Sequence, residues 1–264
     1  MKTFYYDSIN AFVSRASQPL PEGYKGLTDS REEGTRAFTG TDNFEEARKL
    51  ATEGWSAGRK RLLESQKEIS FAGSCKSLDP APFFDVAGDE CDVARFLEGE
   101  PENMLEYQFD YTDKQANKVQ KITLDICASG GVPSDVFPRV GACMLMIADA
   151  LEGAGYRVEI EFVQTSSGSK FDGQWKTLLK PADQPLDLNS LAFWSMHPSA
   201  LRRFWFALYE RDVPANKQSS GYGSARRMKA ESDDEIVICV QDDHFYDDLS
   251  TLNHCNEVLA RFND

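Results

Sequence analysis

The sequence lacks several features that define large functional classes. No stretch reaches the roughly 18 apolar residues that a membrane-spanning helix requires, so we expect no membrane partner. The first residues contain no charged segment followed by an apolar core, which indicates no signal peptide and favours a cytoplasmic location. Basic residues are in the minority, with 29 Lys and Arg against 43 Asp and Glu. The resulting net charge of −14 disfavours binding to phosphate backbones.

Histidine and paired cysteines are also scarce. The chain has three His, and none of its six Cys forms a Cys-x-x-Cys pair, so we expect no zinc site. Cys127 and Cys143 are 16 residues apart, as are Cys239 and Cys255, which suggests matching strand and helix positions. We expect these to be core thiols in a reducing compartment. Gly-x-Ser-x-Gly, His-Glu-x-x-His and dinucleotide-binding motifs are absent, which argues against an enzyme.

The second half of the chain has the pattern of an α/β domain. Residues 119–126 form a β-rich run, and residues 156–163 alternate apolar and polar side chains as a strand does. Between them, apolar residues recur at steps of three and four from Phe137 to Leu151, which predicts a helix. This order predicts a βαβ unit with parallel strands. Further strands are expected at residues 175–179 and 235–241, and helices at residues 186–209 and 247–262.

The first part, residues 1–117, is expected to be a mainly helical, partly mixed extension. Phe4, Ile9, Phe12 and Val13 suggest a short amphipathic helix that ends before Pro19. The pattern also predicts helices starting near residues 44 and 55, a half-buried strand at residues 105–111 and a polar linker at residues 112–118.

Two of the predicted buried strands end in acidic residues. Asp125 ends the first and is followed by Ser129, whereas Asp242 and Asp243 follow the later one. The carboxyl ends of parallel strands meet at one edge of a sheet, where ligands bind. Carboxylate and hydroxyl oxygens suit a hard cation, so Asp125, Ser129, Asp242 and Asp243 are candidate ligands for Mg²⁺ or Mn²⁺.

Residues 121–163 resemble the start of a von Willebrand factor type A domain. That family has an apolar strand leading into Asp-x-Ser-x-Ser, then a long helix and a second strand. Here Asp125 and Ser129 match the motif, and Asp242 falls where the family has a further aspartate. Cys127 replaces the first serine, and a thiol is a poor ligand for Mg²⁺, so the resemblance implies an altered metal-ion-dependent adhesion site.

The resemblance implies a Rossmann-like fold at residues 118–264, with a doubly wound, mostly parallel sheet. It also implies a binding role, with a ring ATPase as a plausible partner. The whole chain is similar to a group of tailed-phage proteins, which implies expression in a bacterial host cytoplasm. The residues that carry this second similarity are residues 38–41, 45–47, 54–55, 86–90 and 197–203.

Three functions follow from these patterns. We expect a protein-binding module that acts through the strand-end edge, and not an enzyme. The first alternative is a phage replication or transcription accessory protein that binds single-stranded DNA, with aromatic residues 204–206 stacking on bases beside Arg202, Arg203, Arg226 and Arg227. The second is a metal-dependent hydrolase that uses Asp125 together with Asp242, Asp243 and His244.

Overall fold

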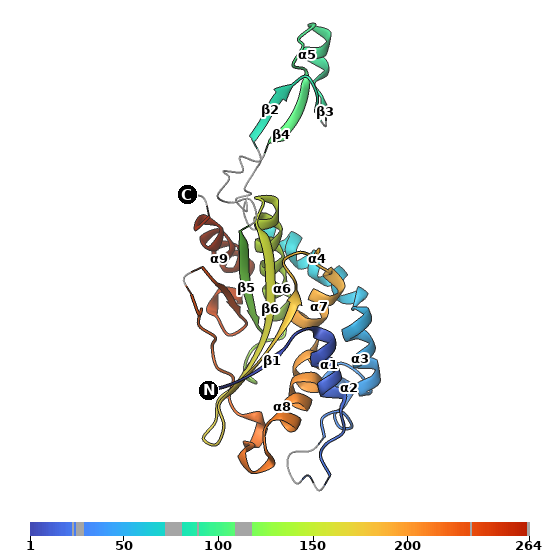
Figure 1. Ribbon diagram of the computed structural model, residues 1–264, viewed down its shortest axis with the longest axis vertical. Helices are drawn as coiled ribbons and strands as arrows, with labels where there is room; N and C mark the ends of the chain where they lie inside the picture. The colour runs from blue at the N-terminus through green and yellow to red at the C-terminus, as the bar shows by residue number, and fades with distance from the viewer. Residues whose placement is uncertain are drawn as a thin grey trace.

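The main sheet has five strands in the order β1-β7-β6-β5-β8 (Figure 1). The computed structural model describes residues 1–22, 24, 29–71, 81–88, 90–108, 118–232 and 234–262. The strands of the sheet are β1 (Lys2–Tyr6), β5 (Val119–Asp125), β6 (Arg157–Ser166), β7 (Gly173–Lys180) and β8 (Ile236–Cys239). β5 pairs in parallel with both β6 and β8. The predicted α/β class with a mostly parallel sheet is therefore confirmed.

The predicted βαβ unit is present as β5, α6 (Val136–Gly153) and β6. The side chains at the predicted helical spacing, among them Val140, Met144 and Ile147, are fully buried. β7 lies where a third strand was expected, but it runs antiparallel to β6. The connection at residues 167–172 explains this, because a parallel crossover needs about a dozen residues or more.

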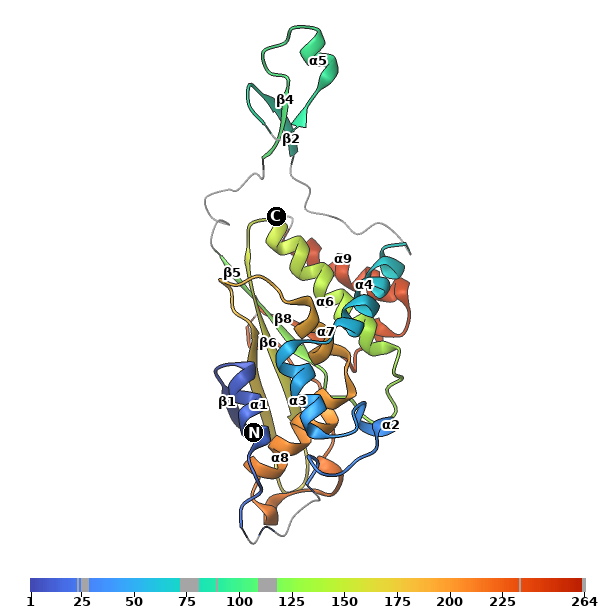
Figure 2. The same cartoon turned by 90° about the vertical axis from the view of Figure 1, so that its right-hand side faces the viewer.

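Helices cover one face of the main sheet. In Figure 2 most of the labelled helices lie on one side of the sheet, and the others contact these helices. Besides α6 they are α1 (Ile9–Ser17), α3 (Phe44–Glu53), α4 (Ser56–Phe71), α7 (Leu188–Met196), α8 (Phe206–Asp212) and α9 (Asp248–Ala260). A π-helical turn at Ala200–Trp205 joins α7 to α8, so the helix predicted over residues 186–209 is divided into shorter elements. The prediction of a doubly wound sheet, which needs helices on both faces, is not confirmed.

The opposite face of the sheet carries charged side chains. Lys121 of β5 forms ion pairs with Glu161 of β6 (3.1 Å) and with Glu235 (3.6 Å). Lys176 of β7 contacts Glu161 (3.3 Å) and Glu231 (2.6 Å). Glu161, Lys176 and Glu235 are buried, with 8%, 6% and 2% of their side chains exposed, so these charges are paired with one another away from water.

The N-terminal segment belongs to the same sheet and core. Residues 2–6 form β1, which pairs in parallel with β7, so the prediction that Phe4 begins an amphipathic helix is wrong. The helix starts at Ile9 with Ser8 as its cap. Phe12 of α1 is fully buried and packs edge-on against Phe162 and Trp194. The division into residues 1–117 and 118–264 stays a prediction, and this packing joins the two parts.

A second, smaller sheet stands apart from the main one in Figures 1 and 2. It contains β2 (Ala81–Asp85), β3 (Glu90–Cys91) and β4 (Met104–Gln108) in the antiparallel order β2-β4-β3, with α5 (Val93–Leu97) between β3 and β4. The short elements are α2 (Arg36–Thr39) and the 3-10 turns Ala215–Lys217, Ser220–Tyr222 and Asp243–Phe245. The predicted linker falls largely outside the described residues. Within those described, no helix is long and apolar enough to cross a bilayer.

Candidate functional site at the carboxyl ends of the parallel strands

The two acidic turns that the sequence singled out meet at one edge of the sheet. Asp125 ends β5 directly beside Cys239, the last residue of β8. The Val240 N–H donates to the backbone carbonyl of Asp125 (2.9 Å), and the Asp242 N–H donates to that of Cys239 (3.0 Å). The sheet therefore brings Asp125 and Asp242 together, as their positions after parallel strands predict.

The Asp125 carboxylate is fully buried and connects three segments. The Cys127 N–H donates to its Oδ1 (3.0 Å), and the Met228 N–H donates to its Oδ2 (3.3 Å). The Cys239 thiol lies 3.6 Å from Oδ2 and donates to it. Burial raises the pKa of Asp125 from 3.8 to about 7; the two N–H groups and the thiol oppose that rise, and the charge of Asp242 adds to it. The buried Asp125 carboxylate thus links the turn after β5, the end of β8 and the segment at Met228.

Asp242 and Asp243 share the guanidinium of Arg227. Its nitrogens lie 3.5 Å from an Asp242 oxygen and 3.8 Å from an Asp243 oxygen. Arg227 also donates to the Gln241 carbonyl (2.5 Å). Partial burial raises the pKa of Asp242, while the charges of Arg227 and His244 oppose the rise. Since the Asp243 side chain is 87% exposed, it is the member of this group most accessible to a partner.

Three of the four predicted metal ligands, Asp125, Asp242 and Asp243, already have other partners in this arrangement. Mg²⁺ needs several free oxygen ligands in octahedral geometry. Both oxygens of Asp125 already accept hydrogen bonds, and Arg227 lies at Asp242 and Asp243. Ser129 lies in an exposed turn that its carbonyl closes by accepting from the Val132 N–H (3.1 Å). In the part of the chain that is described, no three His, Cys, Asp or Glu side chains form a metal-binding group. The Mg²⁺ or Mn²⁺ site stays a prediction that this geometry does not support.

In the two cysteine pairs noted in the sequence, Cys127 with Cys143 and Cys239 with Cys255, one cysteine lies at a strand end and the other in a helix. Cys127 and Cys239 both flank Asp125 at the strand ends, whereas Cys143 of α6 and Cys255 of α9 contact each other with sulfurs 3.0 Å apart. All four are buried. Burial, followed by the charge of Asp125, raises the pKa of Cys127 to about 12 and raises that of Cys239 as well. Cys127 and Cys239 are therefore poor nucleophiles, and all four cysteines are small buried residues.

The residues of the nucleic-acid hypothesis do not form one surface. They are Arg202, Arg203, Arg226 and Arg227 with residues 204–206. Arg203 is buried and donates to the Thr41 hydroxyl (2.8 Å) and to backbone carbonyls. Arg202 lies over the Phe38 ring at 4.3 Å, and Arg227 faces carboxylates. Arg226 is exposed. Residues 204 and 205 are part of the core, where they cannot stack on bases.

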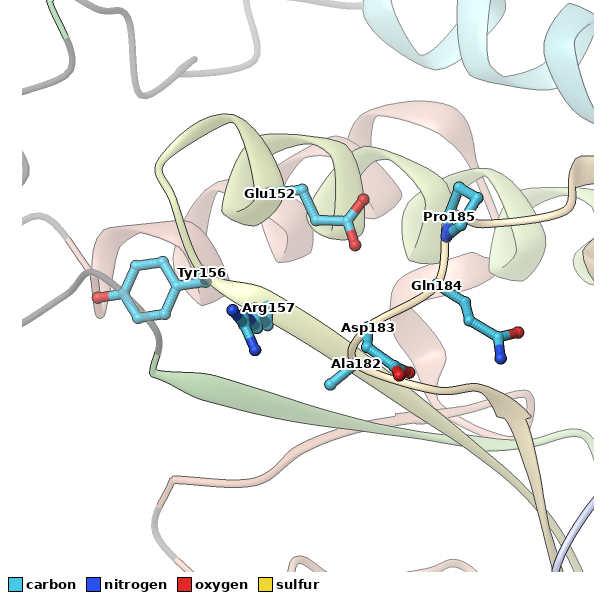
Figure 3. Close-up of a pocket in the computed structure, with 7 residues that line it drawn as sticks. All are labelled: Glu152, Tyr156, Arg157, Ala182, Asp183, Gln184 and Pro185. Atoms are coloured by element: carbon cyan, nitrogen blue, oxygen red, sulfur yellow. The ribbon is translucent and has the colours of Figure 1, made fainter.

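A separate pocket of about 400 Å³ opens at the other edge of the sheet, where β6 begins. Figure 3 shows Glu152 projecting from α6 and Arg157 lying at the start of β6, opposite the chain that follows β7. The Glu152 carboxylate forms an ion pair with the buried Lys180 (2.7 Å). The pocket is lined by Glu152, Tyr156, Arg157 and residues 182–185. It therefore shares no residue with the strand-end site.

Sequence reasoning missed two parts of the site. It considered Arg226 and Arg227 only as nucleic-acid contacts, whereas Thr165 holds this segment through hydrogen bonds to both the N–H and the carbonyl of Arg226. It also missed that the Met228 N–H donates a hydrogen bond to the buried Asp125 carboxylate. No local pattern signals these contacts, because they join β5 and β6 to a segment about 60 to 100 residues away.

Comparison with known proteins gives a family but no activity. One family model, described as a domain of unknown function (DUF7192), matches residues 2–263. No curated protein and no solved structure matches the chain. The match spans β1, the small sheet and the strand-end site. The chain belongs to the DUF7192 family.

Proposed function

We propose that this chain is a protein-binding module that recognises its partner through the carboxyl edge of the main sheet. We call this edge the strand-end surface and define it as residues 129–135 and 241–244 together with Arg227. The observation that carries the proposal is the position of Asp125. Its carboxylate accepts hydrogen bonds from Cys127 in the turn after β5, from Cys239 at the end of β8 and from the Met228 N–H. Preorganised loops on a rigid sheet are typical of binding sites.

The chemistry of the strand-end surface suits a partner with hydrogen-bond donors. Ser129, Asp135 and Asp243 are exposed, and Arg227 leaves about half of its side chain accessible. A Cβ added at Gly130 or Gly131 would meet nothing within 4 Å, so a partner can approach the backbone there. Exposed polar groups beside open backbone favour recognition by hydrogen bonds at a wet interface.

The resemblance to von Willebrand factor type A domains supports the same proposal. β5 lies between β6 and β8, and its last residue, Asp125, corresponds to the first residue of the family's motif. A von Willebrand factor type A domain would bind its partner at this edge, and a ring ATPase is the partner class that the resemblance implies. We propose that binding here does not depend on a cation, because the oxygens of Asp125 are occupied.

Neither alternative function draws comparable support. Single-stranded DNA binding needs exposed aromatic rings beside positive charge, and Phe204 and Trp205 are buried. A hydrolase needs a carboxylate that reaches a metal-bound water. The Asp125 carboxylate is buried and accepts hydrogen bonds from three donors, so it does not reach such a water.

A site-specific crosslink tests the proposal. A photoreactive phenylalanine analogue would replace Asp243 in the full chain, expressed in the cells from which the protein derives. We expect a discrete crosslinked protein that persists in EDTA and is lost when Asp242→Arg is added. The same analogue at Lys60 of α4, an 81% exposed position far from this edge in sequence, is the control. Equal crosslinking from both positions would refute the proposed surface, and a crosslink abolished by EDTA would refute its independence from cations.

A further inference from the structure

The small sheet carries an apolar surface that faces solvent. We call residues 81–108 the arm. Its helix α5 exposes Val93 (64%), Phe96 (60%) and Leu97 (78%), and Val86 just after β2 is 68% exposed. Positions i, i+3 and i+4 share one face of a helix, so the three helical residues form a single stripe. Grouped exposed apolar side chains mark interaction sites more often than isolated ones do.

The stripe faces outward because other residues hold α5 in place. Asp92 caps the helix by accepting from the N–H groups of Ala94 (2.9 Å) and Arg95 (3.1 Å). The Arg95 guanidinium lies 3.9 Å from the centre of the Phe84 ring in β2. No residue of α5 is buried. The helix therefore has a fixed orientation in which a charged side chain packs inward and the apolar side chains stay in water.

The charge of the arm selects the kind of partner. Residues 81–108 contain eight acidic residues and one basic residue, Arg95, so their formal charge is −7, half of the −14 of the whole chain. Two arms brought together would repel each other, as would an arm and an anionic lipid or nucleic acid. A complementary partner has apolar side chains flanked by positive charge.

We propose that the arm docks a protein segment whose apolar side chains are flanked by Lys or Arg, such as one face of a basic amphipathic helix. The apolar stripe of α5 is the contact, and the acidic residues around it, including Glu98, Glu100 and Glu102, steer and orient the partner. This surface is distinct from the strand-end surface. The proposal therefore stands even if the function assigned to that surface fails.

Fluorescence anisotropy with synthetic peptides tests the proposal on the full chain. One labelled helical peptide carries Leu on one face and Lys on the other, and a second carries Glu in place of every Lys. We expect the Lys peptide to bind at least tenfold more tightly than the Glu peptide, with an affinity that falls as salt rises. Equal affinity for the two peptides, or no binding of the Lys peptide, would overturn the proposal.

Three variants locate the contact. Phe96→Ser combined with Leu97→Ser should weaken binding of the Lys peptide at least tenfold. Glu98→Gln and Glu102→Gln together should flatten its salt dependence while leaving the stripe intact. Leu249→Ser changes a 55% exposed apolar residue of α9 and should leave binding unchanged.

Circular dichroism shows whether each variant keeps its fold, and Leu97→Ser alone provides a milder change. Affinities equal to wild type in both arm variants would place the peptide elsewhere and refute the arm as its site. Sedimentation equilibrium covers the remaining case. If the wild-type chain dimerises and the Phe96→Ser, Leu97→Ser variant is monomeric, the occupant is a second copy and the proposed basic partner is wrong.

Discussion

Replacing Asp125 with asparagine should change how the stability of the protein depends on pH. The folded-state pKa of about 7 lies above the ordinary value of 3.8, because the carboxyl group is buried. Between these pH values the folded protein keeps a proton that the unfolded chain has lost. The contribution of Asp125 to stability is therefore complete below pH 3.8 and decreases as the pH rises toward 7.

The size of the effect follows from the two pKa values. Their difference corresponds to about 4 kcal/mol at pH well above 7, and about 2.5 kcal/mol of that is lost between pH 5 and pH 8. An asparagine side chain cannot ionise, so the Asp125→Asn variant avoids this loss. The amide of the variant can still accept from the Cys127 N–H, but it presents a donor toward Met228, which costs about 1 kcal/mol at every pH.

Urea unfolding followed by tryptophan fluorescence at pH 5, 6, 7 and 8 measures this. The free energy of unfolding of Asp125→Asn, relative to wild type, should rise by about 2.5 kcal/mol across this range. Asp243→Asn is the matched control, because its side chain is 87% exposed. Parallel pH profiles for wild type and Asp125→Asn would refute the assignment of Asp125 as a buried carboxyl that favours its neutral form.

Three further substitutions test the packing that supports the site. Phe12→Ala should lower the free energy of unfolding by about 3–5 kcal/mol, because Phe12 fills a fully buried position against two aromatic rings; a loss below 1 kcal/mol would mean that the N-terminal segment is not part of the core. Gly40→Ala should cost about 1–3 kcal/mol in thermal or urea unfolding, because φ is +82° and the new Cβ would lie 2.8 Å from Cε1 of His197. Arg203→Lys should cost about 2–4 kcal/mol by the same measurement, since a lysine cannot serve the Thr41 hydroxyl and the surrounding carbonyls at once; an unchanged stability would contradict this network.

Local patterns were sufficient to predict the central βαβ unit. The spacing of apolar residues in α6 and the alternation in β6 depend on neighbours in the sequence. The same alternation placed Glu159 and Glu161 on one face of β6, and strands buried by helices on both faces are instead continuously apolar. The sequence thus contained the signal against a doubly wound sheet, and the resemblance outweighed it in our prediction.

Other features depend on contacts between distant segments. β1 is short, and only its pairing with β7, about 170 residues later, makes it a strand. The spacing from Asp125 to Ser129 matched a metal site, but whether Asp125 reaches solvent depends on Met228. Aromatic residues beside arginines at positions 202–206 have the same local pattern in a core as on a nucleic-acid surface, and their burial is decided by the fold.

Isothermal titration of the wild-type chain with Mg²⁺ and with Mn²⁺ tests the central claim most directly. The claim is that the buried Asp125 carboxylate holds the strand-end surface together through hydrogen bonds and binds no cation. We expect no saturable heat that depends on Asp125 or Asp242. A one-site binding curve with either ion that disappears in both Asp125→Ala and Asp242→Ala would contradict the account.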